Sequence, residues 1–257
     1  MGLFGGPSAS GVLANAKPGQ LAGYTALVTG ANSGTGFATA EALARAGARV
    51  ILAGRRLDAI DAAVAEIGDK LAESQLAESK LAVGSVEALA GAKLDLNDLA
   101  SVREYAAAYV ASGAELQLLV LNAGVMLQPW GRTPQGFDTT MGVNHLGHFL
   151  LLKKLDKTLR ESPTSGGTSK RVVFLSSMAH AAGKAPPAVA GSDGKLDFAT
   201  WFTPTAGEFS IMESYGNSKL ANLLCAKELA RRYAAEVHTD CAAKFMRIPP
   251  AACGFLK

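Results

Sequence analysis

The sequence has few of the features that mark secreted, metal-binding or membrane-spanning proteins. Only three of its 257 residues are cysteine, and no two are spaced as Cys-x-x-Cys, which argues against a disulfide framework or a zinc knuckle. A reducing compartment, the cytoplasm, is therefore expected. No uncharged apolar stretch is long enough to predict a membrane-spanning helix. No cluster of basic residues occurs and the formal net charge is only +3, so a nucleic-acid partner is not indicated.

Charged residues are also scarce, at 18%, whereas hydrophobic residues make up 49%, and this balance excludes global disorder. The length suits one α/β domain with a sizeable core. Residues 1–22 are rich in Gly, Ala and Ser and lack the basic start of a signal peptide, so they are interpreted as a flexible leader. The folded domain is expected over 23–235, with a polar insertion at 182–212 and an atypical tail at 236–257.

Short apolar runs alternate with stretches of helical periodicity along this domain. Five runs are predicted to be strands: 25–29, 49–53, 93–96, 118–121 and 171–175. Helices are expected at 37–46, 57–67, 98–110, 134–161 and 214–235. Asn97 is the expected cap of the third helix, and 68–91 either extends the second helix or forms a loop. The alternation predicts a three-layer, Rossmann-like α/β fold, in which a doubly wound parallel sheet binds ligands at the carboxyl ends of its strands.

A glycine-rich turn follows the first predicted strand and opens directly into a helix. Its glycines would let backbone N–H groups approach a pyrophosphate, and the helix N-terminus would add partial positive charge. No Gly-Lys-Ser or Gly-Lys-Thr follows, so a P-loop is disfavoured. The turn therefore predicts a dinucleotide site. Its expected cofactor-binding residues are Gly30, Asn32, Ser33, Gly34, Thr35 and Gly36.

Two arginines stand where an NAD-specific site would have an acid. Such a site has Asp or Glu about 20 residues beyond the last glycine, to bind the ribose hydroxyls. Here Arg55 and Arg56 follow the second predicted strand. A guanidinium binds a ribose phosphate through paired donors, whereas a carboxylate would repel it. We therefore predict NADP(H) as the cofactor.

Several further motifs occur in an order that is informative. Tyr215 and Lys219 lie four residues apart on one face of a predicted helix, and Ser176-Ser177 ends the fifth predicted strand. Together with Asn144, Leu94-Asp95-Leu96, Asn122-Ala123-Gly124 and the glycine-rich turn, they resemble the short-chain dehydrogenase/reductase family over about 25–235. The sequences of residues 142–149 and 215–222 are similar to the corresponding segments of one subgroup of this family. That subgroup contains retinol dehydrogenases, WW-domain oxidoreductase and light-dependent protochlorophyllide reductase.

The resemblance implies a catalytic role for four residues. Tyr215 would act as the general acid that protonates a carbonyl oxygen as hydride arrives from NADPH. Lys219 would favour the phenolate form of that tyrosine and hold the nicotinamide ribose. Ser177 would hydrogen-bond the substrate oxygen, with Ser176 as the less favoured partner. Asn144 would hold a water that links Lys219 to solvent.

The resemblance also extends the cofactor site and suggests a substrate class. Asp95, beside Leu96, would contact the adenine amino group, and Asn122, Ala123 and Gly124 would line the adenine ribose and the cofactor groove. Tyr215 and Lys219 would touch the cofactor as well. The expected substrate is a hydrophobic aldehyde, ketone or alcohol such as a retinoid, and the 214–235 helix is the segment through which a homodimer could form.

Two alternatives to this interpretation stay open, and a third is disfavoured. One is light-driven reduction of a protochlorophyllide double bond, and another is a truncated, non-catalytic NADP-binding relative. An S-adenosylmethionine methyltransferase is disfavoured, since it would need an acid where Arg55 stands. His145 and His148 are three residues apart on a predicted helix, but no matching Glu or His partner is evident, so no metal site is expected.

After Tyr233 the sequence departs from the family pattern. No β-rich run and no Pro-Gly turn follows, and Pro249-Pro250 discourages a central strand. The C-terminal strands of the sheet are therefore expected to be missing. The fifth strand would then be an exposed sheet edge, and the chain would be marginally stable or inactive without a partner.

Overall fold

The structure, a computed structural model, describes residues 19–77, 84–164, 169–186, 195–233 and 237–243. Six strands form one parallel sheet in the order β3-β2-β1-β4-β5-β6. They are β1 (Thr25–Thr29), β2 (Arg49–Ala53), β3 (Ser85–Ala88), β4 (Leu118–Leu121), β5 (Lys170–Ser176) and β6 (Val237–Ala243). The α-helices are α2 (Gly34–Arg45), α3 (Leu57–Ala77), α4 (Leu99–Ala111), α5 (Thr139–Met141), α6 (Gly147–Glu161), α7 (Phe198–Phe202) and α8 (Ile211–Tyr233). A π-helical turn (Gly142–Leu146) joins α5 to α6, and a 3₁₀ helix (Met178–Ala182) follows β5.

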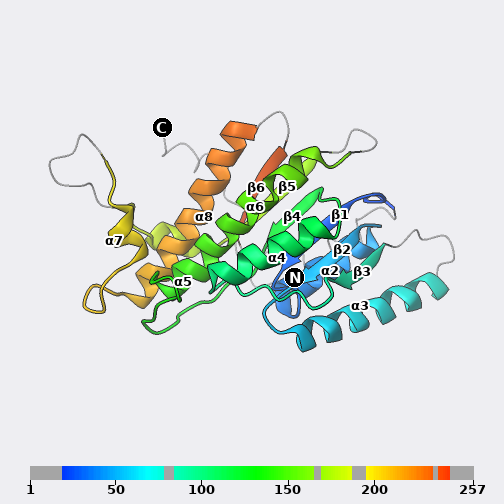
Figure 1. The fold of residues 1–257 in the computed structure, drawn as a ribbon, viewed down its shortest axis with the longest axis horizontal. Coiled ribbons are helices and arrows are strands. Elements are labelled where there is room, and N and C mark those ends of the chain that lie inside the picture. Colours follow the sequence, from blue (N-terminus) through cyan, green and yellow to red (C-terminus); the bar gives the residue numbers. More distant parts are fainter. Residues whose placement is uncertain (1–18, 78–83, 165–168, 187–194, 234–236, 244–257) are drawn as a thin grey trace.

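Helices cover both faces of the sheet, which confirms the predicted three-layer, doubly wound α/β fold. In Figure 1, α4, α6 and α8 run across one face. Leu27 of β1 packs into the core beneath these helices, whereas its neighbour Val28 packs into a second core with α2 and α3. Every residue of β1 and β4 is buried, so neither strand shows the alternating polar pattern of a strand with one face in water.

The strand order determines where the sheet has a crevice that can bind a ligand. β1 pairs with β2 on one side and with β4 on the other, so successive connections leave β1 in opposite directions. At such a switch point the loops after the two central strands separate and leave a crevice at the carboxyl ends. The loops that follow Thr29 and Leu121 therefore face each other across this crevice.

The third strand lies earlier than the sequence predicted. It is β3, Ser85–Ala88, which pairs with β2 from Arg49↔Ser85 to Leu52↔Ala88, and not 93–96. β3 is only half-buried at the edge of the sheet, so its polar composition gave a weak strand pattern. Leu94 and Leu96 are buried because they join the core under α4, and this burial produced the apolar pattern that suggested a strand.

Several helix boundaries also differ from the prediction. The cap of α4 is Asp98 rather than Asn97, and its carboxylate accepts a hydrogen bond from the Ala100 N–H at 2.9 Å. The 68–91 segment first extends α3 to Ala77 and then supplies β3. The expected helix over 134–161 begins only at Thr139, and the π-helical turn interrupts it.

The folded domain begins before residue 23, so the expected boundary of the leader is too late. Leu21 packs against the core beneath α2 and α3, and its N–H donates to the Ala46 carbonyl at 2.8 Å. The segment that begins at Gly19 passes close to Gly47, where a Cβ would lie 3.0 Å from the Gly19 Cα, so Gly47 leaves room for it. The rest of the leader, 1–18, lies outside the described residues.

A sixth strand follows α8, which corrects the expectation that the sheet ends at β5. β6 pairs with the whole of β5 in parallel, from Lys170↔Val237 to Ser176↔Ala243. Val237 is buried, whereas His238 and Asp240 are exposed, so the strand is polar on one face and lacks a β-rich composition. Arg171 and Asp240 form an ion pair across the two strands at 3.0 Å. Residues 244–257, which include Pro249-Pro250, lie outside the described residues.

The described part of the 182–212 insertion is folded against α5 and the N-terminal half of α8. It contains α7, whose Trp201 is buried in a small cluster with Met141 and Ala221 of α8. The Asp138 N–H donates to the Phe202 carbonyl at 2.8 Å, which ties α7 to the start of α5. In Figure 1 this segment lies at one end of the molecule, beside the first turns of α8. None of the helices described is both long and apolar enough to cross a membrane.

Candidate active site

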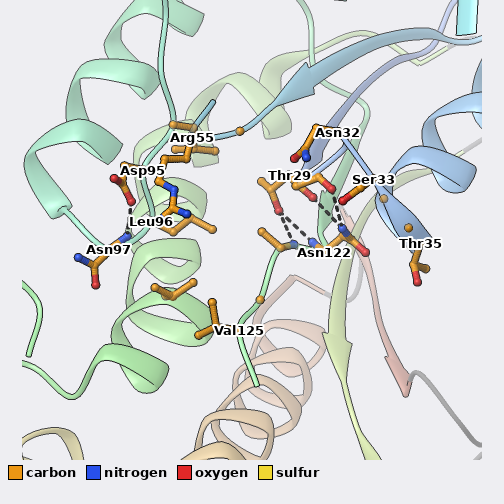
Figure 2. A pocket seen from close by; sticks show the side chains of 18 residues that line it. Thr29, Asn32, Ser33, Thr35, Arg55, Asp95, Leu96, Asn97, Asn122 and Val125 are labelled. Atoms are coloured by element: carbon orange, nitrogen blue, oxygen red, sulfur yellow. Dashed lines mark hydrogen bonds between the residues drawn. The ribbon is translucent and has the colours of Figure 1, made fainter. Parts of the chain in front are cut away.

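A cavity of about 350 Å³ opens at the carboxyl ends of β1 and β4 (Figure 2). Twelve of the residues predicted to bind a cofactor line it: Gly30, Asn32, Ser33, Gly34, Thr35, Gly36, Arg55, Asp95, Leu96, Asn122, Ala123 and Gly124. Six further lining residues were not among the predicted ones: Thr29, Gly54, Leu94, Asn97, Val125 and Val143. Each of these residues flanks a predicted motif or site residue, and Val143 directly precedes Asn144, so the neighbouring motifs were the available signal.

The glycine-rich turn has the geometry of an anion cradle. Gly30 and Gly34 have φ of 64° and 56°, which other residues adopt only with strain. A Cβ on Gly36 would lie 2.3 Å from the Gly30 carbonyl oxygen, whereas one on Gly34 would meet nothing within 4 Å. Ser33 caps α2 without a side-chain hydrogen bond, so the first N–H groups of this helix are left for another acceptor. The cradle therefore fits the phosphates of a dinucleotide.

Thr29 and Asn122 hold the two loops of the crevice together. The Thr29 hydroxyl oxygen accepts hydrogen bonds from the Asn122 and Ala123 N–H groups, each at 3.0 Å. In return, the Asn122 amide donates to the Thr29 carbonyl at 2.9 Å (Figure 2). These bonds fix the wall of the cavity next to the glycine-rich turn.

The opposite side of the cavity carries Arg55 and Asp95, as Figure 2 shows. Arg55 is exposed and contributes to the lining, whereas Arg56 is exposed and does not line the cavity. The Asp95 carboxylate accepts from the Asn97 N–H at 3.1 Å and lies 3.7 Å from the Lys93 ammonium. In the sequence, the position after β2 at which an NAD-specific site has an acid is occupied by Arg55.

Tyr215 and Lys219 lie together in α8, and both are buried. The Lys219 ammonium lies 5.7 Å from the centre of the Tyr215 ring and donates to the Leu175 carbonyl at 3.1 Å. Neither residue lines the cavity itself, but the Lys219 ammonium borders the cavity wall at Gly124. A Cβ on Gly124 would lie 3.5 Å from the Lys219 nitrogen and 3.1 Å from the Asn144 Oδ1.

Asn144 is fully buried in the π-helical turn and clamps the loop that follows β4. Its Oδ1 accepts from the Val125 N–H at 2.8 Å, and its Nδ2 donates to the Val125 carbonyl at 2.9 Å. Nδ2 also donates to the Ser218 hydroxyl at 3.0 Å, which joins this clamp to α8. The water between Lys219 and solvent stays a prediction, and the hydrogen bonds of Asn144 join the Val125 loop of the cavity wall to α8.

The two serines after Leu175 have different surroundings. Ser176 is buried, and its hydroxyl donates to the Lys219 carbonyl at 2.9 Å. Ser177 caps the 3₁₀ helix, because its oxygen accepts from the Ala179 N–H at 3.2 Å, and its hydroxyl hydrogen is not used in that bond. Gly216 lets this helix approach α8, since a Cβ there would lie 2.9 Å from the Ala179 carbonyl oxygen. Ser177 is thereby held next to the helix of Tyr215.

The two histidines of the π-helical turn and α6 are buried beside this site. Burial lowers the pKa of His148 to about 3, and the proximity of Lys219 and His145 adds to that effect. Burial also lowers the pKa of His145. Within the described ranges, no three His, Cys, Asp or Glu side chains are grouped so that they could hold a metal ion. The two histidines are therefore neutral hydrogen-bonding groups.

The fold and the cavity define a dinucleotide-binding protein of the Rossmann type, with a Tyr/Lys pair at the cofactor end. The sequence model described as short chain dehydrogenase matches residues 24–189, and the chain belongs to that family. Mouse retinol dehydrogenase 12 is 39% identical over 213 residues, which cover 83% of this chain and 58% of that protein. Human WW domain-containing oxidoreductase is 39% identical over 210 residues, 82% of this chain and 45% of that protein. The chain thus spans only about half the length of these curated relatives.

Solved structures give the same assignment of fold. An uncharacterised protein from Mycobacterium paratuberculosis superposes with a TM-score of 0.68 at 33% identity, over 91% of this chain and 73% of that one. A complex of Pseudomonas aeruginosa RhlG with NADP superposes with a TM-score of 0.59 at 26% identity, over 87% of this chain and 72% of that one. The resemblance to the short-chain dehydrogenase/reductase family and to its retinol dehydrogenase subgroup is therefore confirmed.

Proposed function

We propose that this protein is an NADP(H)-dependent oxidoreductase that interconverts a hydrophobic aldehyde or ketone and its alcohol. The observation that carries the proposal is the position of Lys219, whose ammonium lies 5.7 Å from the Tyr215 ring and borders the wall of the dinucleotide cavity at Gly124. A proton donor beside a nicotinamide site is the arrangement that carbonyl reduction requires.

The cavity supports NADP(H) as the cofactor. The uncapped start of α2 and the open space at Gly34 suit the pyrophosphate, and Arg55 suits a ribose phosphate. Asn122, Ala123 and Gly124 would hold the ribose side. When bound, the nicotinamide would supply or accept the hydride. The solved complex of RhlG contains NADP, which agrees with this choice.

The side chains near the expected nicotinamide position would transfer the proton and position the substrate. Tyr215 would donate its hydroxyl proton to the carbonyl oxygen of the substrate, while the Lys219 ammonium stabilises the negative charge left on the phenol oxygen. Ser177 would donate its hydroxyl hydrogen to the same substrate oxygen. Asn144 keeps the Val125 loop and Ser218 in register, so that the proton donor and the cofactor groove stay aligned.

Exposed apolar side chains support a hydrophobic substrate. Met126, Leu127 and Trp130 follow the carboxyl end of β4, and Met178 follows that of β5. Leu127 is exposed, and its φ of 53° is a strained backbone conformation for a leucine. The names of the retinol dehydrogenase relatives point to a retinoid as one member of the substrate class.

The experiment that tests the proposal follows NADPH absorbance while the full chain reacts with all-trans-retinal, medium-chain aldehydes and aromatic ketones. We expect reduction of at least one aldehyde in the dark, and much slower reaction with NADH. If the protein instead reduces protochlorophyllide and does so only in light, its activity is double-bond reduction and the proposal of carbonyl reduction is wrong. A rise in melting temperature with NADPH but no turnover on the whole panel would show a non-catalytic binding protein and contradict the proposal.

A further inference from the structure

His148 connects the cofactor groove with the catalytic helices through two hydrogen bonds. Its ring is fully buried in α6. Nε2 lies 2.8 Å from the Thr29 hydroxyl oxygen, and Nδ1 lies 3.1 Å from the Asn144 carbonyl oxygen. Thr29 is the residue that holds Asn122 and Ala123 at the cavity wall. A single side chain therefore touches both the floor of the groove and the backbone of Asn144.

The chemistry of the partners fixes which atom donates in each bond. The Asn144 carbonyl can only accept, so Nδ1 of His148 carries the hydrogen. A neutral imidazole then presents a lone pair at Nε2, and the Thr29 hydroxyl must donate to it. The Thr29 oxygen already accepts from the Asn122 and Ala123 N–H groups, which agrees with this direction. The Thr29 hydroxyl also lies 3.5 Å from the Val120 carbonyl oxygen, but Nε2, at 2.8 Å, is the nearer acceptor for its hydrogen. The arrangement needs a donor at one end of the ring and an acceptor at the other, which histidine supplies.

The network continues from Asn144 to the catalytic lysine. The Asn222 amide nitrogen donates to the Asn144 carbonyl at 3.1 Å and to the Leu175 carbonyl at 3.0 Å. Leu175 is also the acceptor of the Lys219 ammonium. His145 completes the set, because its Nδ1 lies 3.0 Å from the Asn222 Oδ1 and must donate to it. The orientation of Asn222 is thus fixed at both ends of its amide.

We propose that His148 is a positioning residue, which holds the Asn144 carbonyl and, through Asn222 and Leu175, the ammonium of Lys219 in register with the cofactor groove. This role rests on the proposed function, because the position of Lys219 matters only if the Tyr215/Lys219 pair carries out the chemistry. It also accounts for the two histidines in one stretch of helix without any metal ion. Removing the ring's hydrogen bonds should misplace Lys219 without removing a group that touches the substrate.

A spectroscopic test reads the network directly in the cofactor-free full chain. Long-range ¹H–¹⁵N spectra of the histidine rings should show His148 with a protonated Nδ1 and a bare Nε2, unchanged from about pH 5 to pH 8. Thr29→Val, which removes the hydroxyl donor, should move the Nε2 signal downfield. Thr29→Ser, which keeps the hydroxyl, should leave that signal near its wild-type position. A protonated Nε2, or no difference between the two variants, would overturn the proposed link.

A kinetic test separates positioning from packing. His148→Phe keeps an aromatic ring of similar shape but loses both hydrogen bonds, and Leu152→Ala opens a cavity in the same helix at a buried residue outside the network. We expect His148→Phe to lower kcat about 10- to 100-fold with a much smaller change in the KM for NADPH. Leu152→Ala should lower the melting temperature but keep the wild-type kcat.

The outcomes distinguish this inference from the proposed function. If the wild type is active and His148→Phe keeps full kcat, the positioning role is wrong and the oxidoreductase proposal stands. If Leu152→Ala loses kcat as severely as His148→Phe, the effect is one of packing and the inference fails. If His148→Phe does not fold, the pair of Thr29 variants decides the question by the Nε2 signal. An inactive wild type that fails to bind NADPH would instead contradict the proposed function.

Discussion

The ammonium of Lys219 lies 5.7 Å from the centre of the Tyr215 ring, one helical turn away in α8. The helix alone would bring the two side chains to the same face. What fixes the lysine is β5, whose Leu175 carbonyl accepts its hydrogen bond at 3.1 Å. Because β5 pairs with β4 on one side and with β6 on the other, the Tyr215/Lys219 pair is held against an interior strand of the sheet.

Arg55 should determine the preference for NADPH over NADH. It lines the cavity, and a guanidinium-to-phosphate contact contributes roughly 1.5–3 kcal/mol. Arg55→Ala should therefore weaken NADPH binding about 10- to 100-fold and leave NADH binding nearly unchanged. Arg56→Ala is the matched control, since Arg56 is exposed but does not line the cavity, and it should change the preference far less. Dissociation constants from fluorescence titration check this, and equal effects of the two substitutions would contradict the assignment.

Gly36 should tolerate no side chain. A Cβ there would lie 2.3 Å from the Gly30 carbonyl oxygen and 2.5 Å from the Asn122 amide nitrogen, so the glycine-rich turn would have to shift. Gly36→Ala should lower the free energy of unfolding by roughly 1–3 kcal/mol and abolish tight NADPH binding.

The control for this substitution is Gly68→Ala. Gly68 lies inside α3, and a Cβ there would meet nothing within 4 Å. Alanine is favoured over glycine within a helix, so this variant should gain about 0.5–1 kcal/mol. Urea unfolding of both variants measures the contrast. A Gly36→Ala protein with wild-type stability and affinity would show that the close approach is not required.

Acid should destabilise the protein through its buried histidines. Burial lowers the pKa of His148 to about 3, with Lys219 and His145 adding to the effect and the bond to Asn144 opposing it. The unfolded chain takes up a proton near the ordinary histidine value of about 6.5, whereas the folded chain does not. Stability is therefore fully present above that value and falls as the pH drops from about 6.5 towards 3. At pH 5 the loss from such a histidine is roughly 2 kcal/mol.

Urea unfolding at several values between pH 5 and 7.5 measures this loss. His148→Phe should have a flatter pH dependence than the wild type, because one of the groups that must charge on unfolding is gone. His238→Gln, at an exposed residue of β6, serves as the control and should keep the wild-type dependence. Parallel curves for His148→Phe and the wild type would contradict this origin of the acid sensitivity.

The sequence was most informative where a backbone requirement leaves a local trace. The glycines of 30–36 mark a turn with positive φ and a close approach, and twelve predicted residues line the same cavity. β3 was misplaced because an edge strand needs little apolar surface, so Ser85–Ala88 lacked a strand pattern. β6 was missed for a similar reason, because, of its first four residues, Val237 is buried whereas His238 and Asp240 are exposed polar residues.

The polar network could not be read from the sequence, because its bonds join residues far apart in the chain. Thr29 and His148 are separated by 119 positions, and Asn144 and Asn222 by 78. His145 and His148 were visible as a helical pair, but the partners that make them hydrogen-bonding groups come from β1 and α8. Tertiary structure therefore decides what this pair does.

The most direct test of the central claim compares carbonyl reduction by the wild type and by Tyr215→Phe, with NADPH and the best substrate of the panel. Phenylalanine keeps the ring beside Lys219 and removes only the hydroxyl that would donate the proton. We expect kcat to fall about 10²- to 10⁴-fold while the NADPH dissociation constant changes little. Full carbonyl reduction by Tyr215→Phe would show that Tyr215 is not the proton donor and would contradict the mechanism proposed for this site.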